Sequence, residues 1–191
     1  MHGQPPIIIE PYNPSWPMSF ETERQLLLPL LAPWLAGPVE HIGSTAVPGL
    51  PAKPVFDITG AVRELSSSKP TIEALLPLSY CYFEYKAEGM HWFCKPSDFE
   101  RTYHLHLVPF ESDLWYERLA FRDYLRNDET TRWAYMELKL KLANEFRDDR
   151  EAYTDAKTEF IESVLSRARW QDMYGLVRLA NVGTCTTHGS G

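Results

Sequence analysis

The spacing of apolar residues changes once along this 191-residue chain, near Ser112, and that change constrains the fold more than any other feature. Before it, short apolar runs alternate with turn residues, as strands do, and Tyr103 to Pro109 shows a clean period of two. After it, apolar residues recur every three or four positions, as at Tyr135, Leu138 and Leu142. This order predicts an α/β or α+β domain with a helical C-terminal part.

Turn and capping residues divide this outline into elements. We expect an extended arm over 7–9 and a helix that begins after Ser15 and is kinked or ended by Pro29 and Pro33. Strands are predicted over 39–42, 55–59, 80–85, 90–95 and 103–109, with Gly60 ending the second, and a short helix over 66–76. The helical block should hold three helices, the last with its apolar face running from Tyr153 to Ala168.

Composition excludes several classes of protein. The net charge of −7 argues against a broad nucleic-acid surface and against an anionic membrane surface, although it allows a local basic pocket. No apolar run approaches the ~20 residues of a membrane span, and the N-terminus lacks the pattern of a signal peptide. Cys81, Cys94 and Cys185 form no CxxC pair, so we expect neither a disulfide framework nor a structural zinc site. A cytoplasmic protein is predicted, and nothing indicates its oligomeric state.

The segment from Gly43 to Asp57 carries the first functional hypothesis. A Gly43-Ser44 turn after a strand can present backbone N–H groups and a hydroxyl to a phosphate, and Lys53 can neutralise its charge. Asp57 on the following strand is placed to hold a divalent metal that bridges the same phosphates. The alternatives are structural: Ser44 as a helix cap, and Asp57 as the partner of an arginine or a backbone N–H.

Two histidines carry the second hypothesis. The period of two puts His104 and His106 on one face of their strand, where they can line a cleft, move protons, bind a metal or make core hydrogen bonds. His41, beside the Gly-Ser turn, is either a site residue or a structural hydrogen-bonding group. Four basic side chains can line an anion pocket or lie on helix surfaces: Arg101, Arg122, Lys139 and Lys157.

Several motifs together resemble one known family. His41 to Leu50, then Ala52-Lys53-Pro54 and Asp57-Ile58, resemble the GrpB family of nucleotidyltransferase-like proteins. Further matches are Tyr12 to Trp16, His104-Leu105-His106, Phe121 to Arg126, Tyr135 with Leu138-Lys139, and Tyr153 with Lys157 and Phe160. The resemblance covers roughly residues 7–168. It implies a single nucleotidyltransferase-fold domain over 7–170, with a C-terminal extension over 171–191 that ends in a partly disordered tail.

The resemblance also implies a site. Proteins of this superfamily have a small mixed sheet flanked by helices, hold nucleotide phosphates on the Gly-Ser turn and bind magnesium through carboxylates on neighbouring strands. Gly43, Ser44 and Asp57 match those positions. Thr59 stands where a second carboxylate is usual, and the strand expected to carry a third holds His104 and His106 instead. Imidazole prefers zinc, nickel, copper or iron to magnesium.

Three functions are compatible with the sequence. Whichever applies, we expect no tightly bound structural metal. The first is transfer of a nucleotidyl group from a triphosphate to a small acceptor, with Asp57 holding Mg²⁺ and a histidine acting as acid or base. The second is nucleotide-independent acid–base chemistry, such as a cyclisation, on a small metabolite. The third is a non-catalytic small-molecule binding module. The expected catalytic residues are Asp57, His104 and His106, and the expected substrate- or phosphate-binding residues are His41, Gly43, Ser44, Lys53, Arg101, Arg122 and Lys139.

Overall fold

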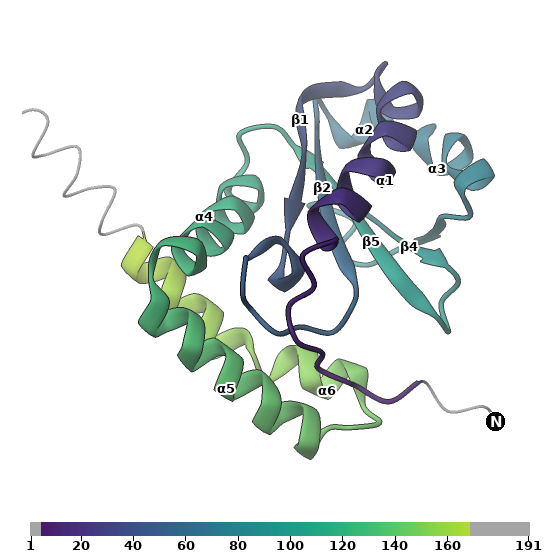
Figure 1. The fold of residues 1–191 in the computed structure, drawn as a ribbon. Helices are drawn as coiled ribbons and strands as arrows, with labels where there is room; N and C mark the ends of the chain where they lie inside the picture. The colour runs from purple at the N-terminus through teal and green to yellow at the C-terminus, as the bar shows by residue number, and fades with distance from the viewer. Residues whose placement is uncertain (1–4, 169–191) are drawn as a thin grey trace, which may run out of the picture.

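A computed structural model describes residues 5–168, and a five-stranded sheet lies at its centre (Figure 1). The strands run in the order β1-β2-β5-β4-β3, with β2 and β5 parallel and the other neighbours antiparallel. Their bounds are β1 Leu35–Ile42, β2 Phe56–Val62, β3 Cys81–Phe83, β4 His91–Pro96 and β5 Arg101–Pro109. The predicted mixed sheet with flanking helices is confirmed.

Helices precede, interrupt and follow the strands. Their bounds are α1 Trp16–Leu31, α2 Leu65–Ser68, α3 Thr71–Ala74, α4 Asp113–Asn127, α5 Glu129–Glu145 and α6 Arg150–Asp155, with 3-10 turns η1 Ser44–Ala46 and η2 Leu76–Leu78. After a turn at 156–157 the chain is helical again over 158–168. The predicted helical C-terminal part is therefore present, and among the described residues no helix is long and apolar enough to cross a membrane.

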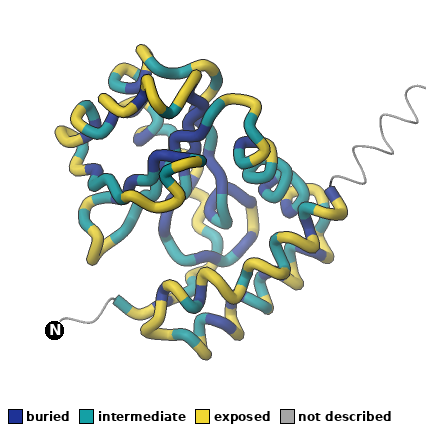
Figure 2. Tube along the Cα trace, turned by 180° about the vertical axis from the view of Figure 1, so that it is seen from behind, coloured by how far each residue is buried: buried dark blue, intermediate teal, exposed yellow. Residues whose placement is uncertain are grey.

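The two faces of the sheet are packed differently. On one face, Ile58 of β2 and Leu105 and Leu107 of β5 meet Leu27 and Leu31 of α1, and all of these side chains are buried. On the other face, Ala61 and Val108 pack against Trp115 of α4 near one end of the strands. Figure 2 shows the buried residues gathered in the interior, where the sheet meets the helices. The period-two alternation predicted for β5 produces this division.

Several element boundaries differ from those predicted: β1 begins at Leu35 rather than at residue 39, and the helix predicted over 66–76 is divided into α2 and α3. Gly60 does not end its strand, because β2 continues to Val62 and Gly60 pairs with Val39 and Leu107 inside the sheet. A Cβ on Gly60 would lie 2.9 Å from Leu107 Cδ2, so the glycine fits a crowded strand interior rather than a turn. The last predicted helix is divided at 156–157, and this turn brings Lys157 to the wall of a cavity that Asp57 also lines.

The N-terminal arm joins the helical half to the sheet half. Ile7 is buried against Leu142 and Tyr153, and its backbone N–H donates to the carbonyl of Arg147 at 2.8 Å. Further along, Glu10 and Ala52 exchange two backbone hydrogen bonds of 2.9 Å. Cys81 and Cys94 face each other across β3 and β4 as free thiols, while Cys185 and the predicted extension over 171–191 lie outside the described residues.

A core substitution on β5 should destabilise the whole domain. Leu105→Ala removes a fully buried side chain from the face that packs on α1, so we expect the free energy of unfolding to fall by about 2–5 kcal/mol. Leu26→Ala is the matched control, because Leu26 lies on α1 but is 47% exposed, and it should change stability by less than about 0.5 kcal/mol. Urea denaturation measures both, and equal losses would contradict this packing.

Candidate functional site

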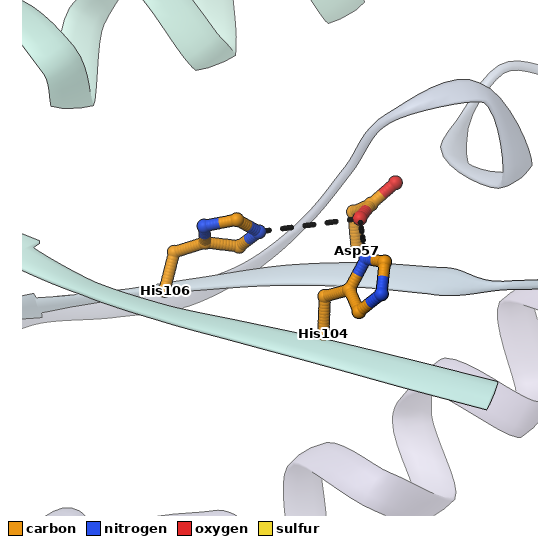
Figure 3. A group of neighbouring side chains, drawn as sticks. All are labelled: Asp57, His104 and His106. Carbon is orange, nitrogen blue, oxygen red and sulfur yellow. Dashed lines mark hydrogen bonds and ion pairs between the residues drawn. The ribbon is translucent and has the colours of Figure 1, made fainter. Parts of the chain in front are cut away.

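Three polar side chains converge on one face of the sheet (Figure 3). His104 Nδ1 lies 2.9 Å from Asp57 Oδ1, at hydrogen-bond distance, and His106 Nε2 lies 4.0 Å from the same oxygen. We call Asp57, His104 and His106 the Asp–His cluster. Its members are partly buried, with side-chain exposures of 31%, 21% and 12% in that order.

The parallel pairing of β2 with β5 creates this cluster. Asp57 is the register partner of His104, and Thr59 is the partner of His106. Because register partners point to the same face, the carboxylate and both imidazoles lie on the face opposite Leu105 and Leu107. Trp92 of β4, the partner of His106, packs beside them with its ring centroid 5.4 Å from that of His104.

The Gly-Ser turn lies directly against Asp57. Gly43 has φ +70°, and a Cβ built on it would collide with the Asp57 carboxylate and lie 2.9 Å from Asp57 Cβ. Only a residue without a side chain lets the turn approach this closely, which is the physical reason for glycine here. Ser44 follows at the start of η1 and lines the same cavity as Asp57.

A cavity of about 640 Å³ opens in front of the cluster, between the sheet and the helical half. The sheet side supplies the Asp–His cluster, Trp92 and Arg101, and the helical side supplies residues of α5, α6 and the turn after α6. Five of the predicted binding or catalytic residues line it besides the two histidines: Ser44, Lys53, Asp57, Arg101 and Lys139.

Lysines form one wall of this cavity. We call Lys53, Lys139 and Lys157 the basic wall; Lys139 is 2% exposed and donates to the carbonyl of Pro51. Burial, with neighbouring cations, lowers the pKa of Lys53 to about 8, that of Lys139 to about 7 and that of Lys157 to about 8. In the described part of the chain, none of the three makes an ion pair, so their charges are only weakly compensated.

Two further lining residues, Trp92 and Arg150, are not indicated as site residues by the sequence pattern. Arg150 donates to the carbonyls of Asp98 and Phe99 at 3.3 and 3.1 Å, and Arg101 lies over the Trp92 ring, 5.0 Å from its centroid. The alternation of β4 is a signal that could have identified Trp92, because it shares a face with Cys94, which pairs with His104. Arg150 has no such signal, since its charge alone is typical of a helix surface.

The electrostatics of the cluster keep Asp57 ionised. Burial alone would raise the pKa of Asp57, but the hydrogen bond with His104 and the nearby His106 imidazole outweigh it and hold the pKa well below its usual range. Burial, together with the Arg118 guanidinium, lowers the pKa of His106 to about 3, so this imidazole is neutral at pH 7. His104 Nε2 and His106 Nδ1 are buried and have no hydrogen-bond partner among the described residues.

The donors present do not fit a magnesium site of the kind that the superfamily resemblance implies. Mg²⁺ requires oxygen ligands in octahedral geometry, and the cluster offers a single carboxylate with two imidazoles. Thr59 does not replace the missing carboxylate, because its side chain is fully buried and its hydroxyl donates to the His106 carbonyl at 3.2 Å. The Asp–His cluster therefore lacks the oxygen ligands that a magnesium site requires.

Two predicted binding residues lie away from the cavity wall. His41 is on the opposite face of the sheet, stacked on Phe20 of α1, and its Nε2 is hydrogen-bonded to Thr45 Oγ1 at 2.9 Å. Arg122 of α4 donates to Glu40 Oε2 at 2.8 Å and to the His41 carbonyl at 3.0 Å. The structure gives both residues structural partners, and their role in ligand binding stays a prediction.

Known proteins resemble this chain over nearly all of the residues that the structure describes. A family model for "GrpB protein" matches residues 6–167. A UPF0157 protein of Pseudomonas aeruginosa is 36% identical over 167 residues, which cover 85% of this chain and 67% of the relative. The glutamate-rich protein GrpB of Alkalihalophilus pseudofirmus is 30% identical over 165 residues, which cover 84% of this chain and 94% of the relative.

A solved structure shows the same architecture. The crystal structure of conserved protein GrpB from Enterococcus faecalis superposes with a TM-score of 0.79 at 32% identity, covering 87% of this chain and 99% of that one. The sequence motifs and the three-dimensional fold therefore point to the same family.

Removing the buried His41 imidazole should change the pH dependence of stability. Burial lowers the pKa of His41 from 6.5 to about 4 in the folded state. Between these values the unfolded chain binds the proton and the folded chain does not, so wild-type stability falls as pH drops from about 7 to 4. In His41→Gln this contribution is absent, so the difference in unfolding free energy between the two proteins should change by up to about 3 kcal/mol. Urea titrations at several pH values measure it, and a constant difference would contradict a buried, neutral His41.

Substituting Gly43, which lies against Asp57, should lower the free energy of unfolding by more than backbone strain alone would. Gly43→Ala forces a Cβ into the Asp57 carboxylate at positive φ, whereas Gly49→Ala also sits at positive φ, +77°, but meets nothing within 4 Å. We expect both variants to lose about 1 kcal/mol or more from backbone strain, and Gly43→Ala to lose more than Gly49→Ala. Denaturant unfolding compares them, and equal losses would show that the turn does not press on Asp57.

Proposed function

This chain belongs to the GrpB family, and we propose that it is an enzyme that acts on a small, negatively charged molecule bound in the cavity between the sheet and the helical half. One observation carries the proposal. The Asp–His cluster and the basic wall face the same cavity, and the wall makes no ion pair within the described residues.

The size and lining of the cavity support a small-molecule ligand. Its volume of about 640 Å³ lies within the range of ordinary ligand pockets, roughly 300–1,000 Å³. Its acidic lining residues other than Asp57 are exposed, namely Glu84, Glu151 and Asp155, whereas Lys139 is buried. An anion that reaches the basic wall would compensate charges that the protein itself leaves weakly compensated.

The cluster supports a chemical step rather than binding alone. The Asp57 carboxylate orients the His104 ring through Nδ1, and Trp92 packs against that ring, so the imidazole is held in one position. Oriented imidazoles next to a carboxylate are the groups that proteins use for proton transfer and for metal-assisted reactions. A binding module would gain little from holding such groups partly buried without full hydrogen bonding.

Nucleotidyl transfer is the second candidate function. It is favoured by the Gly43-Ser44 turn, which lies against Asp57 as the superfamily resemblance implies. It is disfavoured by the buried, hydrogen-bonded Thr59 in place of a second carboxylate. Release of pyrophosphate from ATP by the purified protein in the presence of Mg²⁺ would support this second function over the first.

Anion binding to the basic wall tests the proposed function. Pyrophosphate, citrate and ATP are each added separately to the wild-type protein. At least one of these anions should raise its melting temperature. Lys157→Ala should weaken that binding by about 10- to 100-fold, since a charge-assisted hydrogen bond contributes about 1.5–3 kcal/mol. Lys141→Ala, on the exposed side of α5, is the matched control and should bind like the wild type.

The outcomes separate the candidates. A shift that Lys157→Ala loses and Lys141→Ala keeps supports an anionic substrate. A shift with ATP and Mg²⁺ that exceeds the shift with pyrophosphate supports nucleotide recognition. No shift with any anion, or equal shifts in both lysine variants, would contradict the proposed role of the basic wall.

A further inference from the structure

We propose that Asp57, His104 and His106 bind a divalent transition-metal ion, of the class that includes zinc and iron, at the floor of the cavity. One potential ligand atom from each side chain lies within 4.8 Å of the other two. Figure 3 shows the carboxylate and both rings turned toward one another from two adjacent strands. This departs from the sequence-based expectation of magnesium held with a nucleotide.

The spacing of the donor atoms suits such an ion. Ligand atoms about 2.0–2.2 Å from a tetrahedral zinc ion lie about 3.3 Å from one another. Here Asp57 Oδ1 is 2.9 Å from His104 Nδ1 and 4.0 Å from His106 Nε2, which brackets that value. Small rotations of the side chains would therefore bring all three atoms to ligand distance, without movement of the strands that carry them.

The chemistry of the donors selects the class of ion. Two imidazoles and one carboxylate form the set that holds non-haem iron and many zinc ions, whereas magnesium favours oxygen ligands. The hydrogen bond between His104 Nδ1 and Asp57 Oδ1 already holds these two donor atoms side by side, and a divalent cation would take the place of the proton between them. The fully buried Thr59 adds no carboxylate that would shift the preference toward magnesium.

The location of the cluster suits a reactive ion rather than a structural one. All three donors come from the sheet side of the cavity, so the remaining coordination positions face the space in which a ligand binds. The basic wall on the other side can hold an anionic ligand next to the ion. The catalytic role of the ion rests on the proposed function. Binding of the ion does not, because it requires no substrate.

Calorimetric titration of the metal-free protein with Zn²⁺ tests the proposal. After dialysis against a chelator, the wild-type protein should bind about one equivalent of Zn²⁺, and Mg²⁺ at the same concentration should give no binding heat. Asp57→Asn and His106→Ala should each weaken zinc binding by at least about 10- to 100-fold. Circular dichroism melts report whether each variant is folded, and His104→Ala gives a third, independent ligand substitution.

Two control variants distinguish the Asp–His cluster from the cysteine pair and from the basic wall. Cys81→Ser should keep wild-type zinc affinity, which excludes binding by the facing thiols of Cys81 and Cys94. Lys157→Ala should also keep it while losing anion binding, so failure of the metal site and failure of the proposed function give different results. Absence of zinc binding in the wild type, or wild-type zinc affinity in folded Asp57→Asn, His104→Ala and His106→Ala, would overturn the proposal.

Discussion

The parallel pairing of β2 with β5 is the interaction on which the site depends. It sets Asp57 opposite His104 and Thr59 opposite His106, at positions 47 residues apart in the chain. Parallel strands cannot be joined by a tight turn, so the connection between them has to leave the sheet and return. Here it includes α2, α3 and the hairpin of β3 and β4, which also brings Trp92 beside the histidines. The same pairing therefore positions the catalytic candidates and one side of the cavity.

The two faces of β2 and β5 have different roles: one packs into the hydrophobic core, and the other carries the Asp–His cluster. Leu105 and Leu107 are fully buried against α1 and its neighbours, which gives the strands a rigid hydrophobic support. His104 and His106, between and beside them in sequence, point the other way into a cavity that the helical half completes. A partly buried carboxylate is unfavourable without partners, and the imidazoles supply them at Asp57. The packed opposite face thus fixes the strands that carry the site, while the polar side chains of the site line a cavity on the other face.

Hydrophobic periodicity is sufficient to predict the fold class, most of the strands and the shared face of His104 and His106. It cannot predict which residue of β2 faces them, because register depends on pairing between distant segments. Proximity in sequence is also misleading: His41 adjoins the Gly43-Ser44 turn, but alternation along β1 turns it to the opposite face, against Phe20. Charge alone makes Arg122 a candidate, and only the packing of α4 on β1 shows that its guanidinium donates to Glu40 and a backbone carbonyl. Lys157 reaches the cavity because a turn divides the last predicted helix, which spacing every four residues does not reveal.

The net charge of −7 and the basic cavity are compatible because they act over different distances. The acidic lining residues other than Asp57 are exposed, so solvent and salt screen their repulsion of an incoming anion. In the basic wall, Lys139 is buried and Lys53 and Lys157 are partly buried, and a charge shielded from water interacts with a ligand more strongly than an exposed one. Selectivity would therefore come from the fit of an anion against these few desolvated groups rather than from long-range attraction. A chain that repels anions at its surface can still bind one in its interior, provided that the ligand is small enough to enter and charged enough to compensate the lysines that it meets there.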